Sequence, residues 1–125
     1  MIILDENIFA DQRLFLKKRK IHLRQIGHDL SKRGIKDEGI IPLLLQLPRP
    51  TFFTRDRDFF RSRLCHDRYC LVWLNVSPWH VGEFIWRFLR HLHFRFRKNR
   101  LGKVIRVAPK GITFWEKNEK KRMVW

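Results

Sequence analysis

The strongest constraint on the fold is a series of short apolar runs that alternate with segments of helical character. Residues 2–4 (IIL), 51–54 (TFFT) and 70–76 (CLVWLNV) have the length and composition of buried strands. A weaker apolar alternation over residues 21–26 indicates a further strand. Strands that alternate with helices are typical of α/β proteins with a mostly parallel sheet. We therefore predict an α/β fold.

Three of the intervening segments are predicted to be helices. The first covers residues 7–19 and ends in a KKRK run, where cations suit the helix dipole. The second begins at Asp37 and continues to residue 47, although Pro42 removes one backbone hydrogen bond from it. The third, residues 79–97, has the clearest period and predicts one core face and one basic face. Its apolar face carries Val81, Ile85, Phe88, Leu89, Leu92 and Phe96.

The C-terminal part of the chain predicts an antiparallel closure of the sheet. Val104–Val107 and Ile112–Trp115 flank an Ala-Pro-Lys-Gly turn, which is typical of a hairpin. Residues 117–125 are expected to be a charged tail. Because 125 residues leave room for one modest core, we expect residues 1–125 to form a single domain.

Charge is the strongest compositional signal. The chain has 28 Lys and Arg against 12 Asp and Glu, a formal net charge of +16. A surface of this kind suits polyanions, and nucleic acid comes before an acidic protein segment or an anionic membrane. The alternative is a basic surface that serves only solubility, which would scatter the carboxylates along the chain.

The cysteines and the apolar runs indicate a protein of the reducing cytoplasm. Cys65 and Cys70 do not form the disulfide framework of a secreted domain. Neither a signal peptide nor a membrane span is evident, so we expect a cytoplasmic protein without a membrane partner. With His66 the cysteines give three zinc ligands where a structural site needs four. Arg61 and His66 have the Arg-x4-His spacing of an all-helical class of ribonucleases, which the predicted strands argue against.

The carboxylates are not scattered. Half of the twelve lie in three tight groups: Asp5 and Glu6 after the first strand, Asp37 and Glu38 at a helix start, and Asp56 and Asp58 after the TFFT strand. The ends of parallel strands can meet at one edge of a sheet, where ligands of such folds bind. Carboxylates that converge repel one another unless a cation lies between them, and Mg²⁺ or Mn²⁺ prefers such oxygen ligands.

Each acidic pair also has a purely structural interpretation. Asp37 and Glu38 could cap a helix and complement its dipole. Asp56 and Asp58 could form surface ion pairs with the arginines around them. Asp5 has little structural use directly after a buried strand, except as a helix cap. Taken together, the three groups favour a metal site.

The order IILDENI, GHDL, IKDEGI and FFTRDRDFF resembles the short PIN-like family found beside antitoxins in prokaryotic genomes. The resemblance covers roughly Met1 to Phe60, and TRDRDF after an apolar strand is its most specific part. It implies a three-layer α/β/α sandwich with a mostly parallel central sheet and dependence on Mg²⁺ or Mn²⁺. It also implies endoribonuclease activity, as the toxin of a type II toxin–antitoxin pair restrained by an antitoxin protein.

The resemblance assigns roles to five acids. Asp5, Asp37 and Asp56 match the metal-binding acids, and Asp58 matches the second acid of the TRDRD motif. Longer PIN domains carry another acid on an additional early helix, which this chain lacks and which Glu6 could replace. The RNA backbone is expected to contact four arginines: Arg55, Arg57, Arg87 and Arg90.

Two other functions fit the same sequence. One is a nucleic-acid-binding module without catalysis, and the other is an interaction subunit whose basic face receives an acidic antitoxin segment. Phe94, Trp115 and Trp125 are aromatic residues among cations, so they could stack on unpaired bases. Alternatively, they could contact an antitoxin or the second copy of a homodimer.

Overall fold

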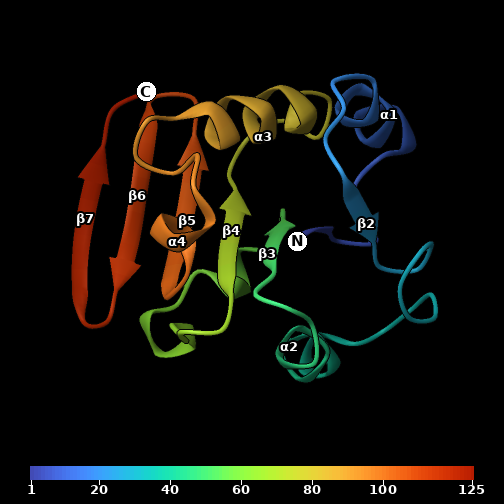
Figure 1. Cartoon of the computed structure of the whole chain (residues 1–125), viewed down its shortest axis with the longest axis horizontal. Helices are drawn as coiled ribbons and strands as arrows, with labels where there is room; N and C mark the ends of the chain where they lie inside the picture. Colours follow the sequence, from blue (N-terminus) through green and yellow to red (C-terminus); the bar gives the residue numbers. More distant parts are fainter.

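A seven-stranded mixed sheet organises the protein, as the computed structural model of residues 1–125 shows (Figure 1). The strand order is β2-β1-β3-β4-β5-β6-β7. The elements in chain order are β1 (Ile2–Leu4), α1 (Ala10–Lys18), β2 (Leu23–Gln25), α2 (Asp37–Leu45), β3 (Thr51–Thr54), the 3₁₀ turns η1 (Arg57–Phe59) and η2 (Ser62–Leu64), β4 (Cys70–Leu74), α3 (Val81–Arg90), α4 (Arg97–Arg100), β5 (Lys103–Ala108), β6 (Gly111–Glu116) and β7 (Glu119–Met123).

The pairing of the strands changes along the sheet. Strands β2, β1, β3, β4 and β5 pair in parallel, whereas β5–β6 and β6–β7 are antiparallel. The predicted α/β class is confirmed, as are the strand at Thr51–Thr54 and the hairpin that turns between Ala108 and Gly111. The residues that end β1 and β3 therefore come to the same edge of the sheet.

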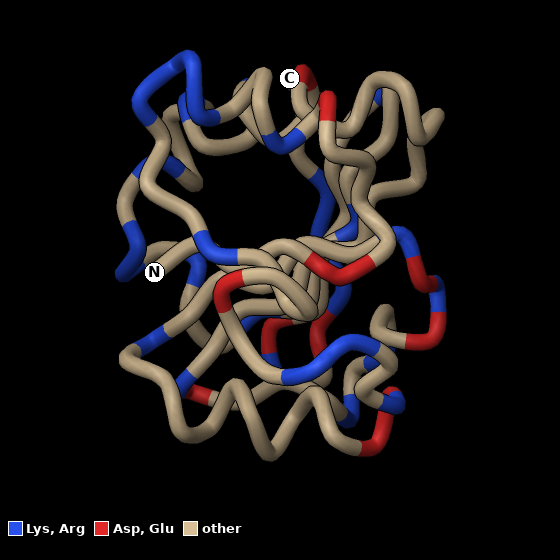
Figure 2. Tube along the Cα trace, turned by 90° about the vertical axis from the view of Figure 1, so that its right-hand side faces the viewer, with Lys and Arg blue, Asp and Glu red and all other residues tan.

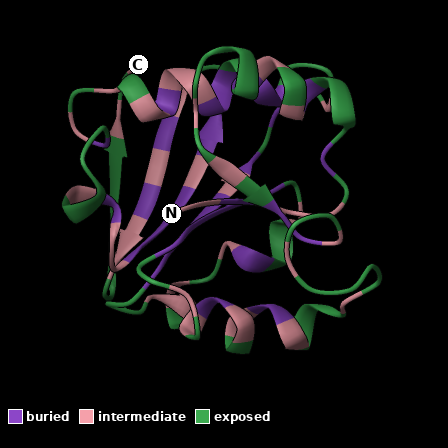
Figure 3. Cartoon of the chain, turned by 45° about the vertical axis from the view of Figure 1, so that its right-hand side comes forward, coloured by how far each residue is buried: buried purple, intermediate pink, exposed green.

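Helices pack on both faces of the sheet because successive strand side chains point in opposite directions. Ile3, Phe52 and Leu71 pack with α2, and we call this side the α2 face. Their neighbours Leu4 and Phe53 pack with α1 and α3 on the α1/α3 face. Figure 3 shows the buried strand residues (purple) between the two helical layers, whose outer sides are exposed (green).

Helix α3 is shorter than its sequence period predicts. It ends at Arg90, where His91 takes an extended conformation with ψ 134°. The side chain of Leu92 is consequently 81% exposed, and that of Phe96 is 52% exposed. Phe94, expected on the basic face as a base-stacking residue, is fully buried against Phe88 and Phe114. Thus the apolar period of the sequence continues beyond Arg90, the last residue of α3.

The charged segment at the end of the chain also differs from the prediction. Residues 117–125 were expected to be a tail, but Glu119–Met123 form β7, paired with β6 along its length. Pro42, by contrast, is accommodated within α2 at an exposed position. None of the helices is both long and apolar enough to cross a membrane.

Candidate metal centre at the edge of the sheet

Three carboxylates converge where β3 ends and α2 begins. Asp37, Asp56 and Asp58 each offer one oxygen, and these three oxygens lie within 4.8 Å of one another. Asp37 opens α2, Asp56 follows β3 by two residues, and Asp58 lies in η1. In Figure 2 the acidic segments concentrate in the half of the molecule that contains α2.

Asp37 does not cap its helix. The residue that precedes the first turn of α2 is Lys36, and no side chain caps that turn. The capping interpretation of Asp37 is therefore wrong, whereas Asp37 and Glu38 do lie in the first turn of α2, where negative charge suits the helix dipole. Partial desolvation raises the pKa of Asp37 above its ordinary value, and a hydrogen bond to Asp56 and repulsion from the nearby acids raise it further.

Asp56 and Asp58 hold η1 together. The Oδ1 atom of Asp56 accepts a hydrogen bond from the backbone N–H of Asp58 at 2.9 Å. The carboxylate of Asp58 lies 3.4 Å from a guanidinium nitrogen of Arg61 in an exposed ion pair. Such exposed pairs contribute little to stability. The ion-pair interpretation thus applies to Asp58, while Asp56 has no cationic partner within ion-pair distance.

Asp5, one of the three predicted metal ligands, is not among the converging carboxylates, where Asp58 takes its place; Asp5 is linked to the group through Thr54. The Thr54 hydroxyl donates to Oδ2 of Asp5 at 2.6 Å and accepts from the backbone N–H of Asp56 at 3.0 Å. Oδ1 of Asp5 accepts from the backbone N–H of Glu6 at 2.7 Å. Burial is the main cause that raises the pKa of Asp5, and the charges of Asp56 and Glu6 add to it. The sequence prediction did not include Thr54.

Glu6 has a different partner from the other acids. Its two carboxylate oxygens accept from the backbone N–H of Gly34 at 2.8 and 2.9 Å, in the loop that leads to α2. Gly27 makes room for this contact, because a Cβ atom there would lie 3.0 Å from Oε2 of Glu6. Glu6 thereby holds the loop that leads to Asp37. It is not one of the three converging carboxylates.

Gln25 organises the backbone around the first two acids. Its side chain is fully buried. Its amide nitrogen donates to the carbonyl oxygens of Asp5 at 2.9 Å and Ile8 at 2.8 Å. Arg13 donates to its amide oxygen at 2.8 Å. The available sequence signal for this role was the position of Gln25, which shares the strand face of Leu23 in the alternating segment Leu23-Arg24-Gln25.

The four predicted RNA-binding arginines separate into two pairs. Arg55 and Arg57 lie in the loop after β3, beside the acids. Arg87 and Arg90 belong to α3, and their guanidinium groups stack on aromatic rings, at 4.5 Å from Trp125 and 4.9 Å from Trp86. Because α3 covers the α1/α3 face, the structure separates Arg87 and Arg90 from the carboxylates.

Zinc is not supported at the cysteines. Cys70 is fully buried on the α1/α3 face, where burial raises the pKa of its thiol to about 12. Cys65 packs against the core of the α2 face. The two thiols therefore lie on opposite sides of the sheet, and the three aspartates are the only group of at least three metal-ligating side chains.

The three aspartates fit a hard divalent cation. Carboxylate oxygens that lie within 4.8 Å of one another repel by at least about 1 kcal/mol in water and about 3 kcal/mol at an effective dielectric of ~20. An all-oxygen donor set suits Mg²⁺ or Mn²⁺, and an exposed site leaves room for the waters that Mg²⁺ retains. The residues therefore fit Mg²⁺ or Mn²⁺ in their donor chemistry, and binding of either ion stays a prediction.

Fold and site together define an α/β protein with a carboxylate cluster at the edge of a mixed sheet. No family model, curated protein or solved structure matches this chain. Its function is therefore argued from its own residues.

Proposed function

We propose that the protein is a metal-dependent endoribonuclease of the PIN-like kind. The observation that carries the proposal is the convergence of Asp37, Asp56 and Asp58 within 4.8 Å, in a chain of net charge +16. Asp56 and Asp58 have local contacts in η1, and Asp37 lies in the first turn of α2, but these contacts do not require the three carboxylates to converge. The positive surface would attract the RNA, and the carboxylates would supply the reactive centre.

The proposed roles follow from the contacts. Asp37, Asp56 and Asp58 would hold Mg²⁺ or Mn²⁺, and Asp5 would complete the negative charge of the site while fixing Asp56 through Thr54. A divalent ion bound there lowers the pKa of a coordinated water and stabilises the charge of the phosphodiester. The arginines of the same loop, Arg55 and Arg57, would hold the phosphate backbone next to the acids.

The PIN-like architecture is part of this proposal. Helices on both faces of a largely parallel sheet are compatible with a three-layer α/β/α sandwich. The acids that the resemblance assigns follow β1, open α2 and follow β3. Restraint by an antitoxin protein stays a prediction from the resemblance.

Cleavage of a single-stranded RNA in the presence of Mn²⁺ tests the activity. We expect Asp56→Asn and Asp5→Asn to lower the rate by at least about 100-fold, because outer-shell partners of metal ligands already contribute 10- to 100-fold. The matched control is Asp11→Asn, an exposed acid on α1. Equal rates for wild type and Asp56→Asn would contradict the proposal.

A nucleic-acid-binding module without catalysis is the second candidate. The engagement of Glu6 with Gly34 favours it, because no side chain then replaces the acid of longer PIN domains. Such a module would bind RNA with strong salt dependence and leave it intact. Its Asp56→Asn variant would bind RNA as tightly as wild type or more tightly, since a repulsive charge is removed.

A further inference from the structure

A groove of about 1020 Å³ lies on the α2 face over β4–β7. Its lining has a one-sided charge. Five cations contribute to it, and no Asp or Glu does: Arg57, Arg106, Lys110, Lys120 and Arg122. Two aromatic residues, Phe60 and Trp73, line it as well. The volume is that of the largest small-molecule sites.

The strand register builds this lining. Trp73, Arg106, Thr113 and Arg122 lie side by side across four neighbouring strands. The guanidinium of Arg106 lies 5.5 Å from the centre of the Trp73 ring. Phe60 packs against the same ring with its centre 5.5 Å away. The lining therefore has an aromatic pair at the β4 end and cations across β5 and β7.

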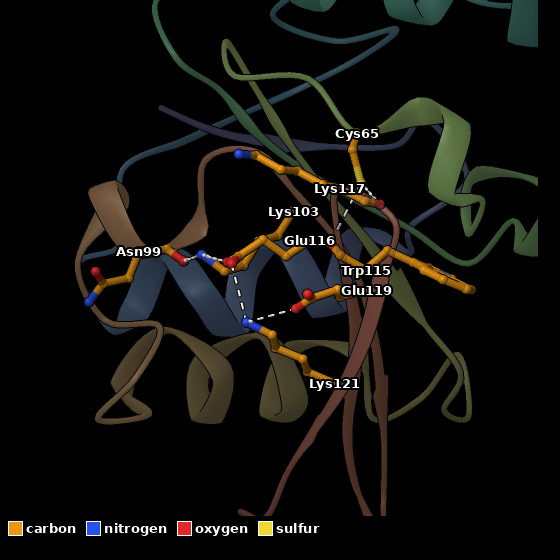
Figure 4. Close-up of polar contacts among 8 residues, drawn as sticks. All are labelled: Cys65, Asn99, Lys103, Trp115, Glu116, Lys117, Glu119 and Lys121. Carbon is orange, nitrogen blue, oxygen red and sulfur yellow. Dashed lines mark hydrogen bonds and ion pairs between the residues drawn. The ribbon is translucent and has the colours of Figure 1, made fainter.

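The carboxylates of this part of the chain point to the other face. Glu116 contacts Lys103 at 3.1 Å and Lys121 at 3.3 Å, and Lys121 also contacts Glu119 at 3.7 Å (Figure 4). Lys121 pairs in register with Phe114 of the α1/α3 core, which places this ion-pair network opposite the groove. The cations in the groove thus keep an uncompensated charge.

The groove begins where the carboxylate cluster ends. Arg57 lines the groove, and its chain neighbours Asp56 and Asp58 belong to the cluster. Both sites lie on the α2 face. A linear polyanion that lies in the groove would therefore reach the carboxylates without crossing the sheet.

We propose that the groove binds the backbone and bases of single-stranded RNA and leads the strand to the carboxylate cluster. The proposal rests on the ribonuclease function and adds the substrate class and the binding surface. Cations that track phosphates beside aromatic rings that contact base faces are the features of single-strand binding. In a duplex the base faces are stacked on one another and cannot contact Phe60 or Trp73. An acidic peptide would contact the cations but has no base to stack on the aromatic rings.

Binding is measured by fluorescence anisotropy of a labelled oligouridine RNA, in EDTA so that cleavage does not interfere. The groove variant is Lys120→Gln with Arg122→Gln, two exposed residues of β7. The control is Lys17→Gln with Lys18→Gln, two exposed residues of α1. Both variants lose two charges. We expect the groove variant to bind about 10-fold more weakly, with a salt slope smaller by about 1.4, and the control to change affinity less than about twofold.

Three outcomes would overturn the groove. These are equal weakening by the two variants, equal affinity for a double-stranded RNA of the same length, and tighter binding of an oligoglutamate peptide than of the RNA. Cleavage by wild type separates the two proposals. If the groove variant loses affinity but wild type never cleaves RNA with Mn²⁺, the groove binds RNA and the nuclease proposal is wrong. If wild type cleaves RNA and the groove variant binds and cleaves it normally, the nuclease proposal is supported and the groove proposal is wrong.

Discussion

The carboxylate cluster and the cationic groove lie on the same face of the sheet but are built in different ways. The cluster takes its three aspartates from the segment after β3 and from the first residue of α2, at the ends of regular elements. The groove takes its cations largely from strands, where the register between β4 and β7 fixes their spacing. Its positions are therefore determined by backbone pairing, whereas the cluster depends on a few loop contacts.

This difference separates two functions of charge. The aspartates repel one another, and a cation among them would relieve that repulsion, so the cluster is suited to a small ion. The groove cations are spread over a long surface, which suits an extended anion. Arg57 belongs to the groove and lies in the chain between two acids of the cluster, so it connects the two regions.

Reversing the charge of Arg57 should have the largest effect. We expect Arg57→Glu to weaken RNA binding by about 100-fold, because a like charge would then face the phosphates at the junction of the two regions. The affinity is measured by fluorescence anisotropy of the labelled oligouridine. The control is Lys18→Glu, an exposed charge reversal on α1. Equal losses in both variants would mean that only the total charge matters.

Mn²⁺ should stabilise the folded protein by binding to the cluster, and the groove should not contribute to this stabilisation. At a free Mn²⁺ concentration of 100 Kd, binding to the native state adds about 2.7 kcal/mol, which raises the melting temperature by about 10 °C. Asp37→Asn should lose this shift, and Asp11→Asn should keep it. Differential scanning fluorimetry measures the effect. A shift of the same size in Asp37→Asn would exclude Asp37 as a ligand.

Thr54 should matter for the cluster alone. Thr54 is fully buried, and its hydroxyl connects Asp5 to the backbone of Asp56. Thr54→Val keeps the shape and removes both hydrogen bonds, so we expect Mn²⁺ affinity to fall by about 10-fold. Thr54→Ser should retain it. Titration calorimetry checks the pair, and RNA affinity in EDTA should stay close to that of wild type. Reduced RNA affinity in Thr54→Val would show that the two regions are coupled.

The parts of the fold that the sequence predicted are those with strong local signals. The TFFT strand and the β5–β6 hairpin are short apolar runs between turn residues, and both form as predicted. The end of α3 is different, because the apolar period continues through Leu92 and Phe96 while His91 turns the chain. At this point Phe94 packs into the core and the chain leaves the helix. The apolar period of the sequence gives no sign of that tertiary contact.

The charged strand β7 was missed for a related reason. Its sequence, EKKRM, has no apolar alternation, and it forms because the exposed edge of β6 offers backbone partners. Without β7 the groove could not be predicted, since Lys120 and Arg122 line it only when they pair with β6. Parallel strand ends predict that the residues after β1 and β3 lie near each other, and Thr54 does connect Asp5 to Asp56. The converging group nevertheless takes Asp58 from η1 in place of Asp5. That exchange and the role of Glu6 depend on loop geometry, which the sequence does not show.

The smallest effect is the pH dependence of the cluster without metal. The pKa of Asp37 is raised in the folded protein above its ordinary value of 3.8, so the folded state binds the proton more readily than the unfolded state. Stability should then rise as the pH falls through this raised pKa, because protonation relieves the repulsion with Asp56. In Asp37→Asn the repulsion is absent at every pH. The variant should therefore melt at a higher temperature than wild type at pH 7 in EDTA, and the difference should shrink towards pH 4. A constant difference over this range would mean that the carboxylates do not repel one another, and the case for a cation between them would lose its physical basis.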